Sequence, residues 1–269
     1  SPNGCKHLHH YFTREVFEGG AFKEKTDDEI KEFIDRKVKD YKESIFHGKT
    51  GERENYAFDK YRTLLFPLLK NASSEFASTG FVPVKIEDKS SIIYPLSDST
   101  KIILKGKADR IDVLEKDGKK YVRIVDYKTG KKDISPDDVR NGFEMQMLTY
   151  LFSNCEGNVV PAGVMYFLCG FPASNTPLFM RNGIMLDCDE VKDEMKFLTD
   201  NSLFSKSGFQ SKEVIDELKD AVEKNVENVG RDIINGKMSI SPMVRKKKSP
   251  CTYCSAKLYC RKKLAEDED

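Results

Sequence analysis

A two-residue turn signal, Asp117-Gly118, stands between two segments rich in β-branched residues, 108–114 and 120–127. Asp-Gly in this setting favours a type I′ turn, whose two central residues need positive φ angles and which joins antiparallel strands. A two-residue turn also fixes the strand register, so Asp109 falls opposite Asp126. The sequence therefore predicts two carboxylates side by side on a β-hairpin.

The two carboxylates and a nearby lysine predict a metal-dependent hydrolytic site. Close carboxylates raise each other's pKa, and their oxygen atoms suit magnesium, manganese or calcium. Lys128 points to the same face as Asp126, because side chains alternate along a strand. A bound metal would polarise a phosphoryl oxygen and lower the pKa of its water, while Lys128 orients that water or stabilises negative charge. The alternative is a surface hairpin with solvated charges.

The helix expected after the hairpin carries two further candidates. Gln146 and Tyr150 are four residues apart and therefore lie on one helix face, close in sequence to the strand of Asp126. They are placed to contact a phosphate or Lys128. The alternative for Tyr150 is an ordinary core position.

The remaining patterns predict an α/β fold with a central mixed sheet flanked by helices. Two amphipathic helices precede the hairpin, one capped at Thr26 and one following Gly51, and Pro67 is expected to kink or break the second. Further strands are predicted at 81–86, 101–104, 159–168 and 178–185, and further helices at 136–151 and 212–234.

Composition limits the class of protein. The 269 residues are 39% hydrophobic and 33% charged, which suits one large domain or two small ones. The apolar run at 159–170 is too short to cross a bilayer and the N-terminus has no signal pattern, so a cytoplasmic protein without membrane contact is predicted. The net charge of +1 leaves nucleic-acid affinity to local patches. A start at Ser1 rather than Met suggests a processed product or a fragment.

Three of the seven cysteines, Cys251, Cys254 and Cys260, lie within ten residues. An odd cysteine count without a signal peptide argues against a disulfide framework, whereas this spacing is typical of a metal site. Three local thiolates need a fourth ligand from elsewhere. Tetrahedral zinc and a four-iron cluster both satisfy that number, and the spacing does not choose between them.

Together these motifs resemble the PD-(D/E)XK nuclease superfamily, in the branch formed by the RecB and AddB nuclease domains. The resemblance rests on Gly-Lys-Ala-Asp-Arg-Ile-Asp at 106–112, on Asp-Tyr-Lys-Thr-Gly at 126–130, and on Gln146 with Tyr150. The C-terminal segment from Ile233 to Cys260 is similar to the same branch. The resemblance implies a restriction-endonuclease-like core with a Cys-rich C-terminal staple, and hydrolysis of phosphodiester bonds in DNA.

The resemblance also implies a role for each site residue. Asp109 and Asp126 would bind Mg2+ or Mn2+, and the Tyr127 carbonyl would add a ligand. Lys128 would serve the attacking water, and Gln146 with Tyr150 would steady the site.

Two further metal-site candidates follow from the family pattern. The family places a histidine on an early helix, and the candidates here are His7, His9 and His10. His9 ranks first because it shares a helix face with Phe12 and Val16. Glu87 matches an acidic strand end of the family, either as an outer metal ligand or as a surface residue.

At the cysteines, the resemblance favours a 4Fe-4S cluster. It implies Cys251, Cys254, Cys260 and Cys5 as ligands, a set that would staple the two chain ends around the nuclease core. The family usually separates its first cysteine from the histidine helix by a longer stretch. The alternatives are therefore Cys5 as the fourth ligand, or Cys5 as a free thiol in a fragment that lacks the cluster.

The predicted organisation is an N-terminal helical region (1–80), a nuclease core (81–240) and a basic, Cys-rich segment (241–269). Arg245, Lys246, Lys247 and Lys248 give the last segment a positive patch suited to a DNA backbone, with a solvated tail as the alternative.

The function predicted is a magnesium-dependent deoxyribonuclease, an exonuclease, within a helicase-nuclease that has a partner subunit. Such an enzyme would act in DNA end processing and double-strand break repair. The rival interpretations are a non-catalytic DNA-binding module of such a complex and a zinc-stapled protein-interaction domain.

Overall fold

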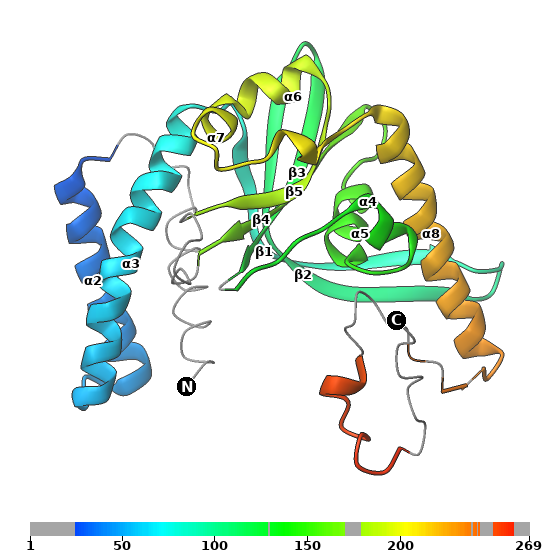
Figure 1. The fold of residues 1–269 in the computed structure, drawn as a ribbon, viewed down its shortest axis with the longest axis horizontal. Helices are drawn as coiled ribbons and strands as arrows, with labels where there is room; N and C mark the ends of the chain where they lie inside the picture. Colours follow the sequence, from blue (N-terminus) through cyan, green and yellow to red (C-terminus); the bar gives the residue numbers. More distant parts are fainter. Residues whose placement is uncertain are drawn as a thin grey trace, which may run out of the picture.

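A computed structural model describes residues 25–128, 130–169, 179–237, 239–240, 242 and 250–260. In this part of the chain, six strands form one mixed sheet in the order β1-β2-β3-β4-β5-β6 (Figure 1). The β3-β4 and β5-β6 pairs are parallel and the other pairs are antiparallel. The predicted mixed sheet is confirmed. The strands are β1 (Val82–Pro95), β2 (Lys101–Lys116), β3 (Lys119–Lys128), β4 (Val159–Leu168), β5 (Arg181–Leu186) and β6 (Phe209–Gln210).

Helices flank the sheet, as predicted. Figure 1 shows α2 and α3 together at one side, and α4, α5 and α8 gathered at the other. α5 packs on β3, β4 and α8. Among the helices of the described residues, none is both long and apolar enough to span a membrane. The helices are α2 (Asp27–Phe46), α3 (Glu52–Ala77), α4 (Pro136–Arg140), α5 (Met145–Ser153), α6 (Asp189–Glu194), α7 (Lys196–Asp200) and α8 (Lys212–Ile234), with short 3-10 helices η1 (Lys206–Gly208) and η2 (Pro250–Tyr253).

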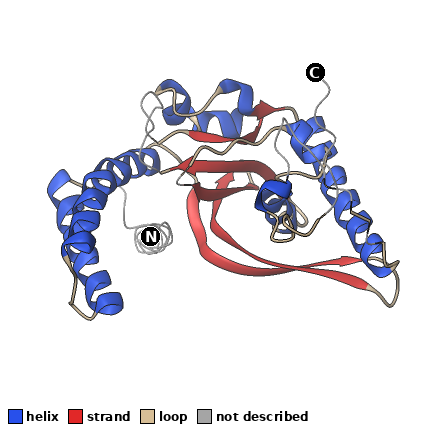
Figure 2. Ribbon diagram, turned by 60° about the horizontal axis from the view of Figure 1, so that its bottom comes forward, coloured by secondary structure: helices blue, strands red, loops and turns tan. Residues whose placement is uncertain are grey.

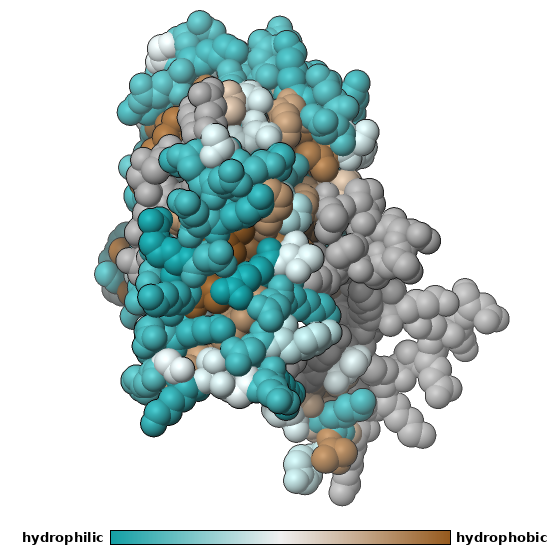
Figure 3. Space-filling view, turned by 90° about the vertical axis from the view of Figure 1, so that its left-hand side faces the viewer, coloured by the Kyte–Doolittle hydropathy of each residue, from teal (hydrophilic) through white to brown (hydrophobic). Residues whose placement is uncertain are grey.

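α2 begins where its capping sequence predicts. The Thr26 hydroxyl accepts a hydrogen bond from the Glu29 backbone N–H, and the Glu29 carboxylate accepts one from the Thr26 N–H. The apolar residues spaced three and four apart are buried through Tyr41, whereas Ile45 near the helix end is exposed. Figure 3 shows the side of the molecule that α2 occupies, where most of the described surface is hydrophilic, as expected for helices that bury one stripe.

The break considered at Pro67 is wrong, because α3 runs from Glu52 to Ala77 through this residue. A proline inside a helix costs about 3 kcal/mol through a lost hydrogen bond and a steric clash. Burial of apolar side chains on both sides of Pro67 offsets that cost. The buried leucines are Leu64, Leu65, Leu68 and Leu69.

The β2–β3 hairpin forms as predicted. Asp117 and Gly118 have positive φ angles of 52° and 71°, the signs that a type I′ turn requires. The strands pair continuously from this turn to Arg110, which is opposite Val125. The observed register is therefore the one that the turn predicts.

β1 and β2 are longer than the sequence patterns indicate. The two predicted segments at 101–104 and 108–114 belong to one strand, because Gly106 and Lys107 between them stay paired with β1. β1 likewise continues past its predicted end at 86 to Pro95. Figure 2 shows these two strands curving away from the rest of the sheet as a long arm.

The single helix predicted at 136–151 is two helices, α4 and α5. Gly142 and Glu144, which lie between them, have positive φ angles of 81° and 54°. Such left-handed residues cannot continue a right-handed helix, and the conformation is unfavourable for a residue with a Cβ. This break turns α5 so that it packs on β3 and β4.

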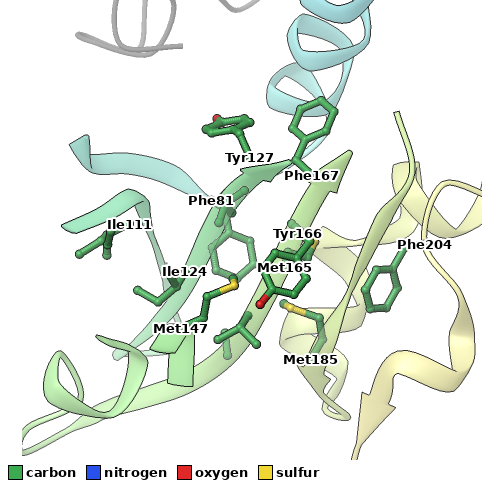
Figure 4. Close-up of a cluster of buried hydrophobic side chains, with 14 of the residues drawn as sticks. Phe81, Ile111, Ile124, Tyr127, Met147, Met165, Tyr166, Phe167, Met185 and Phe204 are labelled. Carbon is green, nitrogen blue, oxygen red and sulfur yellow. The ribbon is translucent and has the colours of Figure 1, made fainter. Parts of the chain in front are cut away.

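The core lies around β3 and β4, the middle strands of the sheet. β4 is buried along most of its length, as predicted for a central strand. Figure 4 shows the buried side chains here, including Met147 from α5 together with Ile124 and Met165 from the strands. Cys169, just after β4, is buried as predicted, and Cys155 is half-buried.

A network of buried charges joins α3 to the sheet. Asp112 of β2 accepts a 2.8 Å hydrogen bond from Arg123 Nε and pairs with Arg110 Nε at 2.8 Å. Glu75 of α3 pairs with Arg123 at 3.1 Å and with Arg181 at 2.6 Å. All five side chains are buried. Removing such ions from water costs several kcal/mol each, so the network depends on all of its pairs.

Glu75 remains ionised in this network. Burial alone would raise its pKa, but Arg181, Arg123 and Arg110 lower it to about 2. The folded pKa is thus below the ordinary 4.5. The carboxylate therefore contributes its full stabilisation above about pH 4.5 and loses it as the pH falls towards 2.

We expect Glu75→Gln to lower the free energy of unfolding by about 3–5 kcal/mol at neutral pH, because buried guanidinium groups lose their counter-charge. The difference from the unchanged chain should shrink as the pH falls from about 5 to about 2. Urea unfolding across this pH range measures both effects. The control is Glu115→Gln, which removes an exposed pair with Lys120 and should cost less than about 1 kcal/mol. An equally small effect at Glu75 would contradict the role of the network.

Candidate active site

The predicted carboxylates lie at the open end of the β2–β3 hairpin. Asp109 and Asp126 directly adjoin the Arg110–Val125 pair, one on each strand. The Oδ2 atom of Asp109 accepts a 3.1 Å hydrogen bond from the backbone N–H of Tyr127. Asp109 is 8% exposed and Asp126 is half-buried. The hairpin register therefore places two acids at one end of the same strand pair.

Lys128 belongs to the same group. Its ammonium pairs with the Asp126 carboxylate, so the two side chains share one face of β3, as predicted. The ammonium also lies 5.6 Å from the centroid of the Tyr166 ring. Tyr166 is opposite Asp126 on the neighbouring strand β4. A cation over an aromatic face gains roughly 0.5–2 kcal/mol, so Lys128 has both an anionic and an aromatic partner.

Sequence reasoning missed three residues around Lys128. The Tyr166 hydroxyl donates a 3.1 Å hydrogen bond to Glu144, and Lys132 pairs with the other Glu144 oxygen at 2.5 Å. Burial and the nearby Glu144 raise the pKa of Tyr166 well above its usual range, so its hydroxyl keeps the proton it donates. No sequence signal marks Tyr166, because the register of the parallel strands β3 and β4 depends on the long connection between them.

Gln146 and Tyr150 share one face of α5, as predicted. Gln146 Nε2 lies 3.4 Å from the Tyr150 hydroxyl and donates a hydrogen bond to it. Tyr150 is buried and Gln146 is exposed. The Tyr150 hydroxyl packs against Gly106, where a Cβ atom would lie only 1.7 Å from the oxygen. Gly106 thus lets the α5 tyrosine approach β2 close to Asp109.

Tyr127 links the two faces of the sheet. Its backbone N–H binds Asp109, while its hydroxyl accepts a 2.6 Å hydrogen bond from Arg110 of the buried charge network. Its ring lies 5.5 Å from that of Phe167, and Figure 4 shows the two rings near the ends of β3 and β4. The side chain of Tyr127 therefore anchors the backbone beside the acid pair.

The position predicted for Glu87 is wrong, because it lies within β1 rather than at a strand end. Its carboxylate pairs with Lys107 at 3.0 Å. The difference arises because β1 continues past this point as the long arm.

Several predicted site residues lie outside the described part of the chain. These are the early histidines, including His9, together with Cys5 and the basic run Arg245, Lys246, Lys247 and Lys248.

The C-terminal cysteines are carried by η2 and the turns after it. Cys251 is half-buried, and Cys254 and Cys260 are exposed. Short backbone hydrogen bonds, such as Cys260 N–H to Ala256 at 2.8 Å, fold this segment. Thiolates are suitable ligands for zinc or an iron-sulfur cluster.

Within the described residues, no three His, Cys, Asp or Glu side chains form a ready-made metal site. The acid pair is nevertheless suited to magnesium, which commonly uses one or two carboxylates and keeps several of its waters. The Tyr127 carbonyl adjoins the pair on β3 as a further oxygen.

A model of the PD-(D/E)XK nuclease superfamily matches residues 7–261. The chain belongs to this superfamily. The match includes every described residue of the acid pair, Lys128 and α5. The predicted family resemblance is confirmed.

Curated relatives are named as one of the subunits of an ATP-dependent helicase/deoxyribonuclease. The Clostridium acetobutylicum protein is 26% identical over 279 residues, which cover 87% of this chain and 24% of the relative. The Clostridium novyi protein is 28% identical over 273 residues, with coverage of 87% and 24%. The Bacillus subtilis protein is 28% identical over 263 residues, with coverage of 81% and 23%. The chain therefore spans about a quarter of the length of these PD-(D/E)XK relatives.

We expect Gly106→Ala to destabilise the chain by about 1–3 kcal/mol, because the new methyl group overlaps the buried Tyr150 hydroxyl. Adding Tyr150→Phe should restore part of the loss, since it removes the nearest atom. Thermal unfolding of the single and double variants measures this. Gly130→Ala, in open space, is the control. Equal stability of the two alanine variants would contradict the packing of Tyr150 on β2.

Proposed function

We propose that this chain is a magnesium-dependent deoxyribonuclease domain that hydrolyses phosphodiester bonds at DNA ends. The observation that carries the proposal is the placement of Asp109, Asp126 and Lys128 at one end of the β2–β3 hairpin. Membership of a nuclease superfamily supports it, as do relatives named as parts of a helicase/deoxyribonuclease.

In this proposal Asp109 and Asp126 hold the metal ion, with the Tyr127 carbonyl as an added ligand. Bound magnesium would supply positive charge to the phosphate oxygens and a water of lowered pKa. The Tyr127 N–H keeps one Asp109 oxygen oriented through its 3.1 Å hydrogen bond. The remaining carboxylate oxygens are then available to the ion.

Lys128 orients the attacking water or stabilises negative charge on the phosphate. Its partner in this structure, Asp126, would turn to the metal. The Tyr166 ring, 5.6 Å from the ammonium, would then keep Lys128 in place. Glu144 fixes that ring through the Tyr166 hydroxyl. Gln146, exposed beside Tyr150, is placed to contact the phosphate.

The larger setting is also a proposal. The relatives are named as subunits of a helicase/deoxyribonuclease, and the chain matches about a quarter of their length. We infer that the domain works within such an assembly, together with a partner subunit, in DNA end processing and double-strand break repair. Exonuclease action fits a domain that receives DNA from a helicase.

We expect Asp126→Asn and Lys128→Ala each to lower the rate of DNA cleavage by at least about 100-fold, because each removes charge required in the transition state. End-labelled linear DNA, assayed with magnesium and with EDTA, provides the measurement. Both variants should keep the melting temperature of the unchanged chain within a few degrees.

The matched control is Asp117→Asn, at the other end of the same hairpin. Asn-Gly also suits a type I′ turn, so this variant should cleave normally. Cleavage by Asp126→Asn at the rate of this control would reject the assigned site. Magnesium-independent cleavage by the unchanged chain would reject the metal mechanism.

For the C-terminal segment we propose a 4Fe-4S cluster held by Cys251, Cys254, Cys260 and Cys5. Three thiols within ten residues support a metal site, and the family branch favours iron. The cluster would tie the two ends of the chain to the core.

Anaerobically purified protein should therefore contain iron and sulfide and absorb visible light. Cys254→Ser should lose both the iron and the absorbance, whereas Cys188→Ser, outside the cysteine cluster, should keep them. Elemental analysis and absorption spectra make the test. A colourless protein with zinc would contradict the cluster and favour a zinc staple.

A further inference from the structure

The long β1–β2 arm has two different faces. One face packs towards α8, where Ile102 lies against Gly230. Residues of this face, including Tyr94 and Leu104, are half-buried against the core. The other face is open to solvent, so nothing in the described fold explains its residues.

A ladder of lysines and isoleucines occupies the open face. The four pairs across the two strands are Lys89 with Lys107, Ser91 with Lys105, Ile93 with Ile103, and Pro95 with Lys101. Lys107 pairs with Glu87 at 3.0 Å. Within the described residues, no hydrogen bond or ion pair engages Lys89, Lys101 or Lys105.

This arrangement does not favour folding. Lysines directly opposite one another repel across antiparallel strands, as at Lys89 and Lys107. The isoleucine pair at the centre of the ladder stays in water, with Ile93 56% and Ile103 47% exposed. Positive charge around an exposed apolar pair is instead suited to a partner that is both anionic and partly apolar.

A single strand of DNA has this chemistry. Its phosphates are anionic and its unstacked bases offer apolar faces, which proteins contact with basic and apolar side chains. Lys101 and Lys105 flank Ile103 on β2, four residues and roughly 13 Å apart. Two acids of α8, Glu223 and Glu227, line the hollow along the β1 edge. The β2 side is therefore the more favourable path for a polyanion.

We propose that the open face of the β1–β2 arm binds single-stranded DNA, with Lys89, Lys101 and Lys105 on phosphates and Ile93 with Ile103 against bases. The inference rests on the proposed function, since it assigns the DNA a path across the domain. β2 continues from this face to Asp109, four residues after Lys105. DNA bound here is thus delivered close to the acid pair.

The test is equilibrium binding of a labelled oligothymidine strand to the full chain in EDTA, followed by fluorescence anisotropy at several salt concentrations. We expect the triple variant Lys89→Gln, Lys101→Gln and Lys105→Gln to bind at least about tenfold more weakly near 0.1 M salt. The slope of log affinity against log salt should fall by about 2, because each single-strand phosphate contact contributes about 0.7. The melting temperature should stay equal or rise.

The control variant removes three exposed lysines elsewhere on the described surface: Lys39→Gln, Lys49→Gln and Lys224→Gln. It has the same net charge as the test variant and should keep most of the affinity and salt slope. Equal losses in the two triple variants would overturn the proposal, because only net charge would then matter. Unchanged binding in the test variant would overturn it as well.

The isoleucines test the choice of a single strand over a duplex. Ile93→Thr with Ile103→Thr retains β-branched residues in both strands and should weaken single-strand binding by a few fold or more, while duplex binding changes little. A variant that binds both forms normally would overturn the proposed base contacts. Because all binding is measured in EDTA, these results are independent of cleavage. An inactive but DNA-binding chain would count against the proposed nuclease function alone.

Discussion

The buried pair of Asp112 and Arg123 determines the geometry on which the rest of this structure depends. The two residues are directly opposite one another in the β2–β3 hairpin, and both side chains are fully buried. A slip of one residue would turn every side chain of a strand to the other face and leave buried charges without their partners. The type I′ turn and this ion pair therefore select one register. That register also places Asp109 and Asp126 at the open end of the hairpin.

The two faces of the sheet consequently have separate tasks. The face towards α3 holds the charge network, in which Glu75 and Asp112 offset the guanidinium groups of three arginines. The other face carries the acids and Lys128. Tyr127 connects the two, because its hydroxyl binds Arg110 and its backbone N–H binds Asp109. Stability on one face thus supports the placement of polar groups on the other.

Much of the fold and the centre of the candidate site could be predicted from local sequence signals. The Asp-Gly turn predicts the hairpin register, and the Thr26 capping box predicts the start of α2. The same signals predict that Lys128 shares a face with Asp126. Each of these features depends on residues that are near one another in the sequence.

The remainder depends on contacts between distant segments. No local pattern indicates that Glu144 adopts a positive φ angle, so periodicity predicts one helix after Pro136 where the structure has two. Tyr166 resembles any core residue of an apolar strand until β4 is placed beside β3. The buried arginines resemble surface residues until α3 supplies Glu75, 48 positions before Arg123. Pro67 could only be accommodated because the leucines around it find a core.

The central claim is that the hairpin register creates a metal site at Asp109 and Asp126. Anomalous diffraction from crystals soaked in manganese tests it most directly. The account predicts one manganese peak bonded to a carboxylate oxygen of each residue. Manganese bound elsewhere, with the two carboxylates turned apart and no peak between them, would contradict it.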